Sequence, residues 1–160
     1  GLVAPGSVVK LPVFQFRILQ SGAVFYTISA QERDEVITAL AGFVEYEGVA
    51  FGAAAEPYAQ GVAVHRFFNP QVVAHFYTAG EAESQYVQAT YPQLRYEGVA
   101  WWSPAQLEEG AQSVYRFYRY STQSHRYTLD AAQRDTWSSD VDYAYEGLAY
   151  YVWAAPSPTP

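Results

Sequence analysis

The chain has 160 residues, of which 16 are acidic and 9 are basic, so its formal net charge is −7. This balance excludes nucleic acid and anionic membranes as main partners, because both require a basic protein surface. The sequence has no cysteine, which excludes disulfides, cysteine nucleophiles and thiolate zinc sites. No apolar run approaches the roughly 20 residues of a membrane-spanning helix, so we expect a soluble protein without membrane insertion.

The chain contains three copies of one sequence repeat. The tripeptide Tyr-Glu-Gly occurs at residues 46–48, 96–98 and 145–147, and a fixed period of this length is typical of repeat architectures. A single unit of about 50 residues without cysteine or metal would be marginally stable alone, so the units are expected to share a core. We therefore predict one domain over residues 1–155, with repeats at about 11–57, 61–106 and 111–155.

Each unit is predicted to begin with a β-hairpin. Residues 13–16 align with residues 64–67 and 114–117, and each segment ends in phenylalanine. A Tyr-Thr pair follows ten residues after each phenylalanine. Both pieces are short and rich in aromatic and β-branched residues, and turn-forming residues separate them, which favours paired strands.

A short helix and a longer strand complete each unit. Ser29 and Glu32 have the spacing of a capping box, Asp130 repeats the capping position, and Gly80 does so weakly. In the first unit, Val36, Ile37 and Leu40 have helical spacing, which predicts one buried helix face. The closing strand contains Tyr-Glu-Gly, and its glycine is expected to mark a bulge or a close backbone approach.

These elements predict a β-rich α+β domain built from strand–strand–helix–strand repeats. We expect the three units to close around a pseudo-threefold axis, because an open stack would leave two apolar ends without polar caps. The pattern leaves open whether the closed domain is trefoil-like or resembles a small propeller.

Three motifs recur in a fixed order: Val-x-Arg-Phe-Tyr, His-Phe-Tyr-Thr and Tyr-Glu-Gly-Val-Ala-Phe/Trp-Tyr. In this combination, over about residues 11–154, the chain resembles a family of uncharacterised tandem repeats in secreted and surface proteins of bacteria and some fungi, often beside hydrolase or cell-wall-lytic domains. The resemblance implies an extracellular accessory or cell-wall-binding module and no known chemistry. The first unit departs most from the motifs at Gln15, Val24 and Gly52, so any site in it is expected to be degenerate.

The ends of the chain indicate a piece of a larger protein. The sequence lacks an initiator methionine and a signal peptide, so we expect a mature or excised segment. Residues 156–160 alternate proline with serine or threonine and are typical of a stiff linker or tail. A secreted, modular parent protein is the expectation.

Three glutamates are the strongest candidates for a binding or catalytic site: Glu47, Glu97 and Glu146. Each lies between apolar neighbours, and Arg66 and Arg116 recur in the opposite strand. A buried carboxylate needs a charged or hydrogen-bonding partner, so the pairs either join strands structurally or line a cleft that binds sugar hydroxyls. Catalysis is disfavoured, because glycoside hydrolysis divides acid and base roles between two unlike carboxylates. Repeated copies suit multivalent binding instead.

The three histidines, His65, His75 and His125, lack the spacing of metal-binding motifs. Each is predicted to form hydrogen bonds within its own hairpin. Neither a metal nor a cofactor is predicted.

The aromatic residues fall into two groups. Six keep their identity in all three units, which predicts a shared core: Phe16, Phe67, Phe117, Tyr26, Tyr77 and Tyr127. The pairs Trp101-Trp102 and Tyr150-Tyr151 change type between units. Either one ring of each pair reaches solvent as a platform for sugar rings, or the pairs are buried as ordinary core.

The sequence thus predicts a non-catalytic, secreted module that binds carbohydrate or cell-wall glycans through up to three related sites. The alternatives are a structural or protein-interaction domain and, less favoured, a glycan hydrolase. The predicted ligand-binding residues are Arg66, His75, Glu97, Trp101, Trp102, Arg116, His125, Glu146, Tyr150 and Tyr151.

Overall fold

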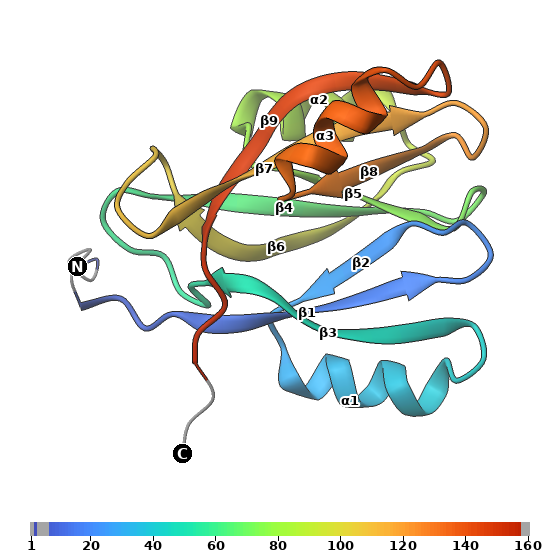
Figure 1. Ribbon diagram of the computed structural model, residues 1–160. Helices are drawn as coiled ribbons and strands as arrows, with labels where there is room; N and C mark the ends of the chain where they lie inside the picture. Colours follow the sequence, from blue (N-terminus) through green and yellow to red (C-terminus); the bar gives the residue numbers. More distant parts are fainter. Residues whose placement is uncertain (1, 3–6, 158–160) are drawn as a thin grey trace.

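A computed structural model describes residues 2 and 7–157 (Figure 1). Its elements follow the order strand, strand, helix, strand three times. The first unit has β1 (Leu11–Ile18), β2 (Val24–Thr27), α1 (Ala30–Ala39) and β3 (Val44–Ala53); the second has β4 (Gly61–Asn69), β5 (Ala74–Thr78), α2 (Glu81–Thr90) and β6 (Arg95–Pro104); the third has β7 (Ala111–Arg119), β8 (Ser124–Thr128), α3 (Ala131–Ser138) and β9 (Tyr143–Trp153). The proposed tail at 156–160 falls partly outside the described residues.

The strands form two antiparallel sheets, with the orders β2-β1-β3-β9-β7-β8 and β5-β4-β6. In the larger sheet the first and third units meet where Gly52 pairs with Trp153. A bridge between Ala54 and Trp102 connects the first unit to the second. The predicted β-rich α+β class is confirmed, with open sheets that do not close into a barrel. Pseudo-threefold closure stays a prediction.

Gly52 occupies the position where the other units carry an aromatic residue, and the packing explains why. A Cβ at Gly52 would lie 2.8 Å from the carbonyl oxygen of Ala154 and 3.3 Å from Pro156. The chain after β9 therefore approaches β3 too closely for any side chain at this position.

The closing strand of each unit is bulged beside its Tyr-Glu-Gly tripeptide. In the second unit, Arg66 pairs with Gly98 but the next residue, Phe67, pairs with Tyr96. Glu97 is therefore the extra residue of a β-bulge. Gly48, Gly98 and Gly147 share φ values of 96°, 93° and 94°, a region that favours glycine. The predicted bulge is confirmed.

One core receives side chains from all three units. Its buried members are Val13, Tyr26, Phe51, Ala53, Val64, Tyr77, Trp101, Val114, Tyr127, Tyr150 and Val152. Smaller clusters hold Phe16 and Phe67, and Phe117 is also fully buried. Burial of the six aromatic residues that keep their identity is thus confirmed.

A ladder of tyrosines runs through this core. The Tyr77 hydroxyl accepts a hydrogen bond from the Tyr26 amide (2.7 Å) and donates one to the Tyr26 carbonyl (3.1 Å). The Tyr127 hydroxyl does the same for the Tyr77 backbone, at 2.7 and 3.1 Å. Each later unit therefore satisfies buried backbone groups of the unit before it.

The helices start as expected but pack differently. Ser29 caps α1 by accepting from the Glu32 amide at 3.0 Å, and Asp130 caps α3 through Ala132. The buried face predicted for α1 is wrong, since Ile37 and Leu40 are 44% and 42% exposed and Val36 is half-buried. The helix lies along the outer side of its own unit (Figure 1), and Val36 and Leu40 line a pocket instead.

Candidate functional site

Two pockets lie where consecutive units meet. The first-boundary pocket, of about 750 Å³, lies between the first and second units and is lined by residues that include Phe25, Glu32, Arg66, His75 and Glu97. The second-boundary pocket, of about 520 Å³, lies between the second and third units and is lined by Phe76, Glu83, Arg116, His125 and Glu146, among others. The two sets occupy equivalent positions in the repeat.

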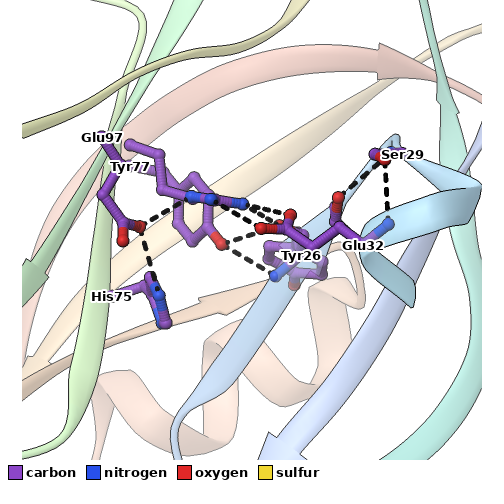
Figure 2. Close-up of polar contacts among 8 residues, drawn as sticks. Tyr26, Ser29, Glu32, His75, Tyr77 and Glu97 are labelled. Atoms are coloured by element: carbon purple, nitrogen blue, oxygen red, sulfur yellow. Dashed lines mark hydrogen bonds and ion pairs between the residues drawn. The ribbon is translucent and has the colours of Figure 1, made fainter. Parts of the chain in front are cut away.

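Arg66 is the centre of the polar network in the first-boundary pocket. Its Nε donates to Glu97 Oε1 at 2.8 Å, and its two terminal nitrogens donate to the two carboxylate oxygens of Glu32 at 2.9 and 3.1 Å. His75 Nε2 lies 3.4 Å from the same Glu97 oxygen. Figure 2 shows Glu97 and His75 at one end of this network and Glu32, extending from the start of α1, at the other. The network thus joins α1 of the first unit to β4, β5 and β6 of the second.

Arg116 repeats this network in the second-boundary pocket. Its Nε donates to Glu146 Oε1 at 2.8 Å, and both terminal nitrogens donate to Glu83 at 2.9 Å. His125 Nε2 lies 3.2 Å from Glu146 Oε1. The two pockets therefore have the same floor of one arginine, two glutamates and one histidine.

A phenylalanine from the earlier unit packs against each floor. The guanidinium carbon of Arg66 lies 5.0 Å from the ring centre of Phe25, and the His75 ring lies 4.7 Å from it. For Phe76, the corresponding distances are 4.8 Å to Arg116 and 4.7 Å to His125. These cation–π and ring contacts hold the polar side chains in place.

Pairing keeps the glutamates ionised. Burial alone would raise the pKa of Glu97, but hydrogen bonds from His75 and the charge of Arg66 outweigh burial and hold that pKa below its usual value. The pKa of Glu32 is lowered in the same way, against burial, by its hydrogen bonds to Arg66. Burial lowers the pKa of His75 despite the nearby Glu97. At neutral pH the floor therefore holds two carboxylates, one guanidinium and a neutral imidazole.

The stability of the domain is expected to fall as the pH falls below neutral. The pKa of His75 is lower in the folded chain, so its contribution decreases as the pH drops through its unfolded-state value near 6.5. The depressed pKa values of Glu32 and Glu97 add a second loss below their usual value of 4.5. Urea unfolding between pH 8 and pH 3 measures this profile.

His75→Gln is expected to flatten the upper part of this profile, between pH 7 and pH 5, while the loss at lower pH remains. An equally steep decline in that range for the variant would show that His75 does not contribute to it.

At the third boundary, between the third and first units, the polar residues differ. Gln15 and Val24 occupy the positions of the arginine and the histidine, and Gln133 that of the helix glutamate. Gln15 donates to Glu47 at 2.9 Å. The buried Arg126 donates to the carbonyl oxygen of Ser21. This boundary therefore lacks the arginine–histidine floor.

Six of the ten predicted ligand-binding residues gather in the two pockets: Arg66, His75 and Glu97 in the first, and Arg116, His125 and Glu146 in the second. Trp101 and Tyr150 are 0% and 3% exposed and belong to the shared core. Each is therefore the buried ring of its pair, and its prediction as a ligand-binding residue is wrong. Trp102 is half-buried against Ala54, Tyr58 and Trp153, and Tyr151 is also half-buried. Neither of them lines the two pockets.

Sequence reasoning missed Glu32 and Glu83. A signal for them exists, because Arg66, Arg116 and Gln15 match Glu32, Glu83 and Gln133 in the preceding unit. The two positions thus hold an arginine and a glutamate in two of the three matches, and two glutamines in the other. Reading this pattern requires knowing that each arginine reaches into the unit before it.

Within residues 2 and 7–157, no cluster of three or more histidine, aspartate or glutamate side chains is arranged to hold a metal ion. The same residues contain no helix long and apolar enough to cross a membrane.

Comparison with known proteins adds one match. A family described as a domain of unknown function (DUF5648) matches residues 12–153. No curated protein and no solved structure matches the chain.

Proposed function

We propose that this chain, which belongs to the DUF5648 family of domains of unknown function, is a non-catalytic, lectin-like module that binds glycans in its two boundary pockets. The observation that carries the proposal is the same Arg–Glu–Glu–His floor in both pockets. Two similar sites on one chain suit a multivalent glycan, because each adds avidity to the other.

The floor has the chemistry that sugar hydroxyls require. Glu97 Oε1 accepts from Arg66 and is paired with His75. No donor from the described residues is directed at its Oε2, which is left to accept from a ligand hydroxyl. Side chains fixed by their own hydrogen bonds lose little entropy when a ligand binds. The pockets thus combine preorganised polar groups with apolar walls, as small-ligand sites commonly do.

The charge states favour binding over hydrolysis. Glycoside hydrolysis needs one protonated carboxyl group beside an ionised one. In the first-boundary pocket, pairing lowers the pKa of both Glu32 and Glu97, so neither holds a proton at neutral pH.

A structural role is the alternative, and one observation favours it. Arg66 is tied to two carboxylates and to the Tyr26 carbonyl oxygen at 3.4 Å, which also describes a joint between units. In that case the domain would space or dock a neighbouring module without binding a glycan.

The proposal includes closure of the three units and a secreted context. Closure is supported by the mutual approach of Tyr26, Tyr77 and Tyr127, with ring centres 5.5, 5.6 and 6.4 Å apart in pairs. The contact of Arg126 with Ser21 adds a link from the third unit to the first. Secretion and attachment to a larger protein rest on the resemblance described above.

Binding of the labelled domain to a glycan array that includes insoluble cell-wall polysaccharides tests the function. We expect saturable binding that free sugar competes away, with two sites per chain in calorimetry. Absence of binding to every glycan on the array would overturn the proposal and favour the structural domain.

A further inference from the structure

The two boundary pockets share a floor but differ in their walls. The first is lined by the apolar side chains of Leu19, Val36, Leu40, Phe43 and Phe68. Three of these, Leu19, Leu40 and Phe43, are exposed, so the apolar wall extends to the mouth of the pocket. Such a wall favours a ligand with an apolar group beside its polar one.

Polar and hydroxyl-bearing side chains line much of the second-boundary pocket. Asn69, Gln93 and Gln123 supply amide groups, and Tyr86 and Tyr118 supply rings with hydroxyls. These groups match a ligand whose surface carries hydroxyls throughout. The difference between the walls therefore predicts a difference in ligand.

The charge of the floor narrows the ligand class further. Each floor carries two carboxylates against one arginine, so an acidic sugar would meet net negative charge. A sugar with a free ammonium group would be attracted by that charge. In the first-boundary pocket, however, it would lose hydration against Leu40 and Phe43.

We propose that the first-boundary pocket prefers N-acetylated hexosamines and the second prefers unsubstituted hexoses. The amide N–H of the acetamido group donates to Oε2 of Glu97, and its methyl group packs against Leu19, Leu40 and Phe43. This assignment rests on the proposed function, since it divides a glycan-binding role between two pockets.

Two matched ligands test the assignment: the β-1,4-linked tetramers of N-acetylglucosamine and of glucose, which differ in the substituent at C2. Calorimetry on the 160-residue chain is expected to show the acetylated tetramer binding at one site at least about fourfold more tightly, the effect of one buried methyl group. Equal affinities of the two tetramers at the first-boundary pocket would overturn the assignment, and so would tighter binding of the deacetylated glucosamine tetramer there.

The chain offers a matched pair of variants at the C-terminal end of α1, where Ile37 lies in the last turn and Leu40 is the C-cap. Leu40 lines the first-boundary pocket, whereas Ile37 does not, and the two are similarly exposed. Leu40→Asn is expected to reduce the preference for the acetylated tetramer, and Ile37→Asn to retain it. An unchanged preference in both Leu40→Asn and Phe43→Ser would contradict the proposed wall contact.

The results separate this assignment from the proposed function. Binding of other array glycans without an acetamido preference defeats the assignment alone. Absence of binding to both tetramers and to the whole array defeats both.

Discussion

Tyr77→Phe is expected to lower the free energy of unfolding by about 2–4 kcal/mol. The hydroxyl of Tyr77 satisfies both the amide and the carbonyl of Tyr26 inside the core. Its loss leaves the Tyr26 amide without a partner and the Tyr26 carbonyl with only the 3.4 Å contact from Arg66, and a buried polar group without a partner costs about 1–3 kcal/mol. Tyr77→Ala also loses a fully buried ring, so its cost is expected to reach about 5 kcal/mol.

Urea unfolding followed by circular dichroism measures both changes. Tyr127→Phe is expected to resemble Tyr77→Phe, because it serves the Tyr77 backbone in the same way. Tyr120→Phe is the control, since Tyr120 is exposed and its replacement should stay within about 0.5 kcal/mol. Equal stability of Tyr77→Phe and Tyr120→Phe would show that the ladder does not stabilise the core.

Arg66→Gln is expected to reduce the number of glycan sites per chain from two to one. The arginine orients both Glu32 and Glu97, and removing one member of such a charged network weakens binding by roughly 30-fold or more. Arg116→Gln is expected to remove the other site, and the double variant both. Calorimetric stoichiometry with a glycan found on the array measures the change.

Glutamine is the appropriate replacement because the chain already uses it. At the equivalent position Gln15 donates to Glu47, so the variant should fold. We expect a stability loss of about 2 kcal/mol from the unpaired carboxylates, which remain partly exposed. Arg17→Gln is the control, because Arg17 pairs on the surface with Glu45. Two intact sites in Arg66→Gln would contradict the role of this arginine.

The sequence predicted the parts of the fold that each unit determines by itself. The hairpins, the bulge at Gly98 and the burial of Phe67 and Tyr77 follow from patterns that recur in every unit. Residues that are buried in every unit cannot vary freely, so their constancy identified them. The pairing of Arg66 with Glu97 was likewise visible, because both lie in one unit.

Contacts between units were harder to predict. Glu32 lies in the unit before Arg66, and local spacing says nothing about that approach. Of the capping box predicted at Ser29, the bond from the Glu32 amide to the Ser29 hydroxyl forms. The Glu32 carboxylate does not complete the box, because it pairs with Arg66. The bulges shift the strand register twice between Phe67 and Val64, which is why simple alternation did not place Trp101 in the core.

The tyrosine ladder also has a direction, which matters while the chain is being made. The backbone of Tyr26 is completed by a side chain from the second unit, and that of Tyr77 by one from the third. Synthesis runs from the N-terminus, so each of the first two hairpins leaves the ribosome with open hydrogen-bonding groups that only later residues can fill. A chain cut short between units would keep that open edge, and the matching tyrosine of another copy could fill it.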